Sequence, residues 1–246
     1  MVKQELLYVQ ITKKITDYII FDASCVHVAC FFIFMYPIFH TFFNERKRKD
    51  IVFMKICVYG AASPTIDPCF IKTVEKMGKL MAERGHSLVF GAGGNGLMGA
   101  AARGVTAGGG KILGIIPKFF KDEVIEEIYD KCDELVFTEN MRERKQLMED
   151  NADAFIIVPG GIGTFEEFFE ILTLKQLCRH NKPIAVYNIN GYYNELETMI
   201  KASISKNFIK ENCSSLYRIT DDIDEIFNYI ENDKLKIKNI KELKDG

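Results

Sequence analysis

Three glycines and a threonine form the most chemically suggestive stretch of the chain, within residues 158–167. An apolar run over residues 154–158 comes first and predicts a buried strand. Apolar residues at the spacing of one helical face come afterwards: Phe165, Phe168, Phe169 and Leu172. The glycines therefore lie in a strand-to-helix turn, where backbone N–H groups can approach an anion at the positive end of a helix. We expect a phosphate to bind at this turn, through Gly160, Gly161, Gly163 and Thr164.

Glu167 follows the turn and allows two interpretations. If Thr164 caps the helix, Glu167 occupies the third position of a capping box and holds the helix end. On a helical wheel of about 100° per residue, Glu167 instead lies beside Ile171 and Leu174, whereas Glu166 points to another side. A carboxylate among apolar residues is typical of a functional site. The spacing leaves both roles open, and they can coexist.

A second glycine-rich turn covers residues 91–99 and also follows an expected strand. Its glycines have the spacing of a dinucleotide-binding fingerprint, but the next strand ends in Ile116-Pro117-Lys118, without the acidic residue that would hold a ribose. One alternative is that the small residues only let a helix pack close to the sheet. We favour a second anion-binding turn that faces the first, with Gly94 and Gly96 as contacts. The chain has no P-loop motif, which disfavours a P-loop NTPase.

Two motifs together resemble the Lonely Guy (LOG) family, the cytokinin riboside 5′-monophosphate phosphoribohydrolases, whose members have often been mislabelled lysine decarboxylases. Pro-Gly-Gly-x-Gly-Thr-x-x-Glu stands at residues 159–167 and Met-x-x-Arg-Lys at residues 141–145. The resemblance runs from about residue 54 to about residue 229. It implies a homodimer with active sites near the interface. It also implies hydrolysis of the bond between base and ribose in a nucleoside 5′-monophosphate.

The resemblance also assigns roles to individual side chains. Arg144 and Glu167 would be catalytic, with Glu167 stabilising positive charge on the ribose and orienting or deprotonating water. The implied substrate contacts are Ser63, Gly94, Gly96, Glu123, Lys145, Gly160, Gly161, Gly163, Thr164 and Thr173. One departure concerns residues 60–63, which read Gly-Ala-Ala-Ser where family members usually have Cys-Gly-Ser-Ser.

Two other classes of protein remain open. A non-catalytic nucleotide-binding or carrier protein of Rossmann-like fold would keep both glycine turns, but it should not need Arg144 and Glu167 together. A decarboxylase would need a cofactor, and no lysine stands in a recognisable pyridoxal context. We therefore expect an enzyme without a cofactor.

Strands alternate with helices along the chain. Expected strands cover residues 55–59, 87–90, 111–116, 134–137, 154–158, 183–189 and 216–219. Expected helices cover residues 67–84, 140–150, 192–207 and 221–229, with two more after the glycine-rich turns. This order predicts an α/β Rossmann-like fold, with a mostly parallel sheet and helices on both faces.

The composition is that of a globular protein, with 246 residues, 48% hydrophobic residues and a net charge of −2, which gives no support to a nucleic-acid partner. Seven cysteines without a Cys-x-x-Cys pair suggest reduced thiols in a cytosol. The four histidines lack metal-ligand spacing. We expect a cytoplasmic protein without a metal.

Residues 1–53 differ in composition from the rest. Residues 23–43 contain no Asp, Glu, Lys or Arg and are long enough to span a bilayer, with the basic residues 46–49 after them. They could be a membrane anchor, an extension upstream of a true start at Met54, or a helix packed on the domain. We favour the second interpretation. The expected organisation is an extension over 1–53, the LOG-like domain over 54–232 and a solvated lysine-rich tail over 233–246.

Overall fold

The computed structural model describes residues 53–123, 126–233, 235 and 239. The chain divides into two units, Met1–Ile51 and Val52–Gly246, and the described residues all belong to the second. The predictions for residues 1–52 and for most of the tail after residue 233 lie outside the described residues.

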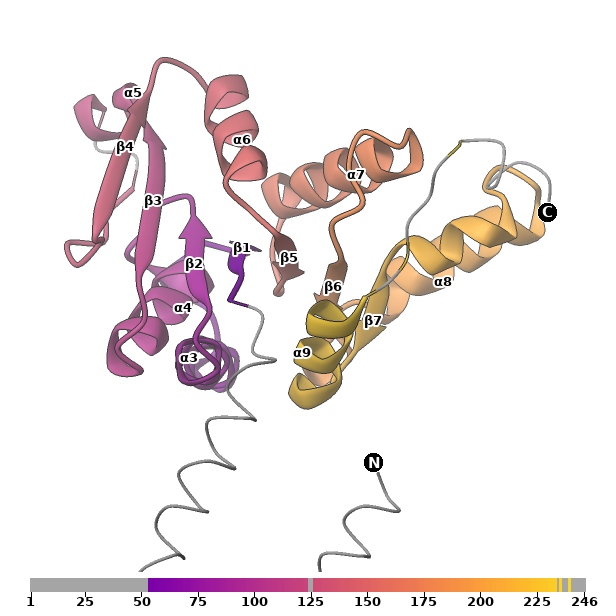
Figure 1. Cartoon of the computed structure of the whole chain (residues 1–246), viewed down its shortest axis with the longest axis horizontal. Helices are drawn as coiled ribbons and strands as arrows, with labels where there is room; N and C mark the ends of the chain where they lie inside the picture. Colours follow the sequence, from indigo (N-terminus) through magenta and orange to yellow (C-terminus); the bar gives the residue numbers. More distant parts are fainter. Residues whose placement is uncertain (1–52, 124–125, 234, 236–238, 240–246) are drawn as a thin grey trace, which may run out of the picture. The chain divides into compact units, whose positions relative to one another are not determined.

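Seven strands form one sheet in which every neighbouring pair is parallel, in the order β4-β3-β2-β1-β5-β6-β7 (Figure 1). The strands are β1 (Lys55–Tyr59), β2 (Ser87–Phe90), β3 (Ile112–Pro117), β4 (Glu134–Thr138), β5 (Ala154–Ile157), β6 (Ile184–Tyr187) and β7 (Arg218–Thr220). All seven follow the predicted segments to within two residues at either end, because continuous apolar runs identify strands that are buried on both faces. The α/β Rossmann-like fold is thereby confirmed.

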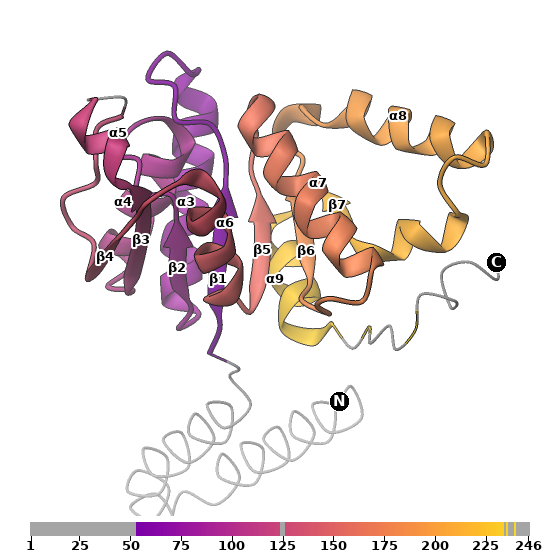
Figure 2. The ribbon, with the colours of Figure 1, turned by 90° about the horizontal axis from the view of Figure 1, so that it is seen from above.

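Helices cover both faces of the sheet, as predicted. They are α3 (Pro68–Glu83), α4 (Gly96–Ala107), α5 (Lys118–Asp122), α6 (Met141–Asp150), α7 (Ile162–Gln176), α8 (Asn194–Ser205) and α9 (Ile223–Asn232), with short 3₁₀ helices η1 (Ile189–Gly191) and η2 (Glu211–Leu216). One core cluster is built with α3, α4 and α9, and the other with α6, α7 and α8. Figure 2 shows α6 and α7 together along one face of the sheet.

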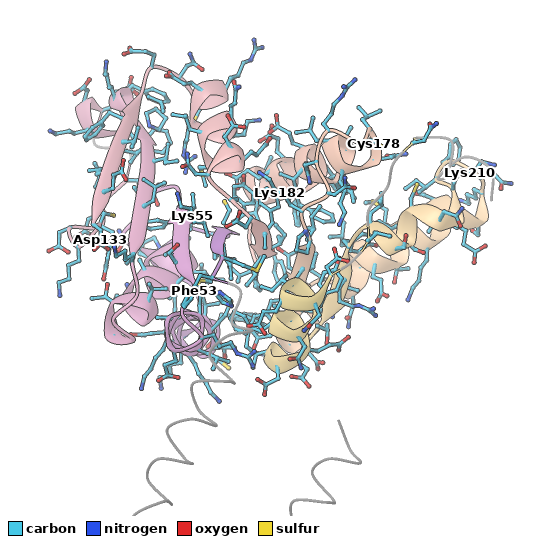
Figure 3. All side chains as sticks on the ribbon, viewed as in Figure 1. Phe53, Lys55, Asp133, Cys178, Lys182 and Lys210 are labelled. Carbon is cyan, nitrogen blue, oxygen red and sulfur yellow. The ribbon has the colours of Figure 1, made fainter. Side chains whose placement is uncertain are left out.

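Alternate residues of β1 serve the two cores, as the period of a strand requires. Ile56 and Val58 belong to the core under α3 and α4, whereas Cys57 and Tyr59 belong to the core under α6 and α7. Side chains fill the space between the sheet and its helices on both faces (Figure 3). The sheet is therefore a rigid base from which the loops at its carboxyl edge project.

The central strands β1 and β5 are adjacent, although β2 lies on the other side of β1. Strand order reverses here, and in open α/β sheets ligands bind in the crevice outside the carboxyl ends of such strands. The turns that follow the two strands touch, because the N–H of Ala61 donates to the carbonyl of Pro159 at 3.1 Å. The sheet thus places the glycine turn of residues 158–161 at the position where this fold holds ligands.

Two elements near the C-terminus are shorter than predicted. The strand predicted over residues 183–189 ends at Tyr187 and is followed by η1, and the helix predicted over residues 192–207 is α8, which starts at Asn194 and ends at Ser205. Asn190 and Gly191 have φ values of +53° and +75°, which a continuous helix cannot contain. Among the residues that the structure describes, no helix is long and apolar enough to cross a membrane.

Candidate functional site

The glycine turn ends at the N-terminus of α7. Gly161 is the cap residue and α7 begins at Ile162. The first hydrogen bond of the helix runs from the N–H of Phe165 to the carbonyl of Gly161, at 3.0 Å. The N–H groups of residues 161–164 therefore precede the helical ladder, and the positive end of the helix dipole lies with them. A helix N-terminus with such N–H groups can bind an anion, and anion binding at this turn stays a prediction.

The capping-box interpretation of Glu167 is wrong. Thr164 lies inside the first turn of α7 rather than at its cap, and no side chain caps this helix. Thr164 is only 4% exposed, and a Cβ atom on Gly160 would lie 2.0 Å from its Oγ1. Because α7 begins three residues earlier than the box requires, Glu167 is about one turn too deep to reach back to the helix end. Its position must have another reason.

The two other glycines of the turn face open space. A Cβ atom on Gly161 or Gly163 would have no protein atom within 4 Å, and neither residue has a positive φ. Packing and backbone strain therefore do not require glycine at these positions. A ligand that approaches the backbone closely would require it.

Glu167 is half-buried on the face of α7 that carries the fully buried Ile171, as the helical wheel predicted. Burial raises the pKa of its carboxyl group from the ordinary 4.5 to about 7, while the nearby positive charge of Arg144 opposes that rise. Glu167 is therefore a carboxyl group that changes its charge near neutral pH.

Arg144 is 5% exposed, and its guanidinium group is held by backbone carbonyls. Its Nε donates to Ile115 at 3.2 Å, and its Nη2 donates to Gly91 at 3.3 Å. The group also lies over the ring of Phe120, 5.7 Å from the ring centre. A Cβ atom on Gly91 would lie 1.6 Å from Nη2, so glycine is needed there to admit the side chain. Within the described part of the chain, Arg144 forms no ion pair within 4 Å, and its charge stays available to a ligand.

Glu126 is a site residue that the sequence did not single out. Its Oε1 atom is buried and has no hydrogen-bond partner among the described residues. Burial raises the pKa of this carboxyl group, and Arg144 partly offsets the rise, so Glu126 faces the same charge as Glu167. The sequence pointed instead to Glu123, which is exposed at the end of α5. The carboxylate that reaches the site is three residues further on.

Lys145 is engaged by the protein itself. Its Nζ lies against Glu166 and is 2.6 Å from Oε2 of Glu170, so two carboxylates of α7 hold this residue of α6. Glu149, on α6, is close enough to Glu170 that the two charges interact, and burial raises the pKa of Glu149 to about 7. Lys145 therefore neutralises a group of carboxylates beside Glu167, which differs from the substrate contact that the resemblance implied.

Comparison with known proteins shows which family the chain resembles. Residues 98–230, more than half of the chain, match the family model described as "Possible lysine decarboxylase". A probable cytokinin riboside 5′-monophosphate phosphoribohydrolase of Oryza sativa subsp. japonica is 36% identical over 171 residues, which cover 70% of this chain and 74% of that protein. The Mycobacterium tuberculosis protein named cytokinin riboside 5′-monophosphate phosphoribohydrolase is 36% identical over 169 residues, which cover 68% of this chain and 88% of that protein.

The chain belongs to the LOG family. Its named relatives are phosphoribohydrolases, and it is accordingly a hydrolytic enzyme. This outcome removes the non-catalytic carrier that the sequence had left open. Solved structures of molybdenum cofactor carrier proteins are similar in fold alone. The Chlamydomonas reinhardtii protein has a TM-score of 0.56 and 21% identity, covering 73% of this chain and 96% of that chain.

The second glycine turn of this LOG enzyme differs from its expected role. The N–H of Gly94 donates to Glu127 at 2.6 Å and that of Leu97 donates to Ala61 at 2.7 Å. Gly96 has a φ of +58°, and a Cβ atom there would lie 2.5 Å from the carbonyl oxygen of Ala61. Because these donors are used inside the protein and the turn is tightly packed, Gly94 and Gly96 hold the turns together. The structure thus favours the close-packing alternative.

The remaining predicted contacts lie at the margins of the site. Ser63 is exposed in the turn after β1, where its hydroxyl lies 3.0 Å from that of Thr65. Thr173 is exposed on α7, more than a turn beyond Glu167. An apolar cavity of about 190 Å³ adjoins the glycine turn on the side away from α6, and its lining includes Phe70 and Tyr192.

Proposed function

We propose that this LOG enzyme hydrolyses the N-glycosidic bond of a nucleoside 5′-monophosphate. The bond between C1′ of the ribose and a nitrogen of the base breaks, and its electron pair leaves with the base. Oxygen from water bonds to C1′, and a proton ends on the base. The products are the free base and ribose 5-phosphate.

The observation that carries this proposal is that the partly buried carboxyl group of Glu167, in the second turn of α7, interacts with the positive charge of Arg144. A carboxyl group whose pKa burial raises to about 7 is partly ionised at neutral pH and can accept a proton from water. The same carboxylate can stabilise the positive charge that develops on the ribose as the bond to the base breaks. Both roles need a negative charge that is partly shielded from water, and Glu167 is half-buried on α7.

The other side chains complete the assignment. The N–H groups of residues 161–164 hold the 5′-phosphate, and this remote binding energy orients the ribose against Glu167. Arg144, fixed by two carbonyls, stabilises the electron pair that leaves with the base. Glu126, whose carboxyl pKa is raised by burial, is placed to donate a hydrogen bond to the base.

The base is of the adenine type, either adenine itself or a cytokinin base. The relatives named cytokinin riboside 5′-monophosphate phosphoribohydrolases, from Oryza sativa, Arabidopsis thaliana and Mycobacterium tuberculosis, support this choice. We also propose that the enzyme is cytoplasmic and acts as a homodimer. Exposed apolar side chains on α7 support an interface there, since Ile162 is 87% exposed and Phe169 is 36% exposed.

A substrate panel tests the proposal. The purified full chain is incubated with AMP, isopentenyladenine riboside 5′-monophosphate, GMP and CMP, and free base is measured by chromatography. Adenosine and isopentenyladenosine are the matched controls without phosphate. We expect free base from the adenine-type monophosphates and a rate at least about tenfold lower from the nucleosides, because they lose the binding energy of the phosphate. Equal rates with AMP and adenosine, or no free base from any monophosphate, would contradict the proposal.

A further inference from the structure

Three successive carbonyl groups of the glycine turn each accept a hydrogen bond from a residue outside the turn. The Tyr193 hydroxyl donates to Val158 at 2.7 Å. The N–H of Ala61 donates to Pro159 at 3.1 Å. The Tyr192 hydroxyl donates to the carbonyl of Gly160 at 2.7 Å. The backbone orientation of the turn is therefore fixed from outside, one peptide unit after another.

The bond from Tyr192 has a consequence for the anion site. The carbonyl of Gly160 and the N–H of Gly161 belong to one planar trans peptide unit, so they point in opposite directions. Tyr192 holds the carbonyl, which directs the N–H to the other side, where the N-terminus of α7 begins. A rotated peptide unit would instead present a partial negative charge to the phosphate.

This particular peptide unit rotates easily unless something holds it. Glycine stands on both sides of it, and glycine adopts conformations on both sides of φ = 0 at similar cost. On the Gly160 side the unit lies against Thr164, but Gly161 has no protein atom near its Cβ position, so packing does not hold that side. The hydroxyl of Tyr192 therefore supplies a constraint that this backbone lacks.

We propose that Tyr192 is a positioning residue for the phosphate: its hydroxyl fixes the Gly160–Gly161 peptide unit so that the Gly161 N–H joins the anion site. This inference rests on the proposed function, since it assumes that the turn binds a 5′-phosphate. The backbone N–H groups bind the phosphate equally well in the ground state and in the transition state. Losing a donor to it therefore weakens substrate binding and leaves the chemical step nearly unchanged.

Tyr192→Phe is the test variant, and Tyr193→Phe is its matched control. The ring of Tyr192 is 42% exposed and packs edge-on against Phe70 at 6.3 Å between centres, so phenylalanine keeps that packing. Tyr193 donates an equally short bond to the neighbouring carbonyl of Val158. The peptide unit of that carbonyl ends at Pro159, which has no N–H to present. Tyr193→Phe therefore removes a similar bond without touching a phosphate donor.

Two measurements are made on the full chain: kcat and KM with AMP, and Kd for inorganic phosphate and ribose 5-phosphate by calorimetry. For Tyr192→Phe we expect KM and both Kd values to rise about five- to twentyfold, with kcat within about threefold of the parent. For Tyr193→Phe we expect a lower Tm, because a buried carbonyl loses its partner, and unchanged Kd values.

The two binding probes separate this inference from the proposed function. If the parent binds inorganic phosphate and Tyr192→Phe weakens that binding while no monophosphate is hydrolysed, the proposed function fails and the positioning role stands. Unchanged Kd values in Tyr192→Phe would overturn the positioning role. Equal weakening in both variants, or no phosphate binding by the parent, would overturn it as well.

Discussion

At the scale of single residues, Glu167 and the glycines before it combine features that stability alone would not select. Burial raises the pKa of the Glu167 carboxyl group to about 7, so the ionised group destabilises the folded state. Glycine within the first turn of a helix is also unfavourable, because other residues form helices more readily. Such local costs are typical of residues kept for chemistry.

Glu167→Gln should lower kcat by about a hundredfold or more, since it removes the negative charge that the developing positive ribose requires. KM should change less than kcat, because the charge acts mainly in the transition state. Glu166→Gln is the control, as that side chain is exposed and pairs with Lys145. Steady-state kinetics with the best monophosphate measures both variants, and similar losses in the two would show that Glu167 has no special role.

Glu167→Gln should also change how stability depends on pH. The folded state binds the proton of Glu167 up to about pH 7, whereas the unfolded chain releases it near the ordinary value of 4.5. The parent therefore loses stability as pH rises from about 4.5 to about 7, and the glutamine variant lacks that loss. We expect the variant to gain on the order of 1 kcal/mol over the parent between pH 5 and pH 8. Urea unfolding at the two pH values measures this gain, and a difference that does not depend on pH would contradict it.

Gly163→Ala should stabilise the protein and weaken substrate binding at the same time. Alanine favours a helix over glycine by up to about 1 kcal/mol, and the added methyl group meets no protein atom. If the phosphate lies against this backbone, the methyl group obstructs it, and we expect KM to rise by about tenfold or more. Tm and KM of the variant are the measurements. A raised Tm with an unchanged KM would mean that no ligand approaches Gly163.

At the scale of elements, α6 and α7 build the site between them. α6 supplies Arg144 and Lys145, and α7 supplies Glu167 together with the two carboxylates that hold Lys145. Each helix has a buried residue in the same core, Met148 on α6 and Phe168 on α7. The charges of one helix therefore set the proton affinity of the carboxyl group on the other.

Lys145→Gln should move the pH profile of the enzyme. The positive charge of Lys145 lowers the pKa of Glu167, so its removal raises that pKa above about 7. Because Glu167 acts in its ionised form, kcat/KM should rise with pH through this pKa, and the variant's profile should be shifted to higher pH. Lys201→Gln, which breaks an exposed pair with Glu197 on α8, is the control. An unshifted profile in Lys145→Gln would separate Lys145 from the chemistry.

At the scale of the whole molecule, a network of hydrogen bonds connects the start of the described chain with α9 near its C-terminus. The N–H of Met54 donates to Nδ1 of His86 at 3.3 Å, and Nε2 of the same ring lies 3.0 Å from Glu231 on α9. Arg84 bonds to Glu231 as well and lies 5.0 Å from the centre of the Phe227 ring. Figure 3 places Phe53 and Lys55 at the entry to β1. These contacts lie at the amino ends of β1 and β2, whereas the site lies at the carboxyl ends of the strands.

A chain that begins at Met54 should fold and keep full activity. The described strands and site residues all lie after this residue, and the terminal nitrogen can still donate to His86. The shortened chain and the full chain are compared by Tm and by kcat/KM with the same monophosphate. We expect agreement within about 2–4 °C, which corresponds to less than about 1 kcal/mol for a domain of this size. Aggregation or loss of turnover in the shortened chain alone would make residues 1–53 part of the working protein.

Features that depend on local spacing could be predicted from the sequence. Apolar runs and helical periods predicted the order of strands and helices, since burial is imposed residue by residue along each element. The glycine turn was placed at the start of α7 for the same reason, and the wheel put Glu167 on the buried side of the helix rather than with Glu166. The residue at which α7 begins did not follow from spacing. Thr164-x-x-Glu167 imitates a capping box, and only the backbone shows that the helix begins earlier.

Contacts between residues far apart in the chain could not be predicted and are known from the three-dimensional structure. Lys145 reaches Glu166 over 21 residues, and Tyr192 reaches Gly160 over 32 residues. Glu126 enters the site while Glu123 stays outside, which depends on how the segment after α5 packs against Gly93. Spacing cannot predict such contacts, because they form when separate elements pack on one sheet, and the geometry of that packing is not encoded within any single element.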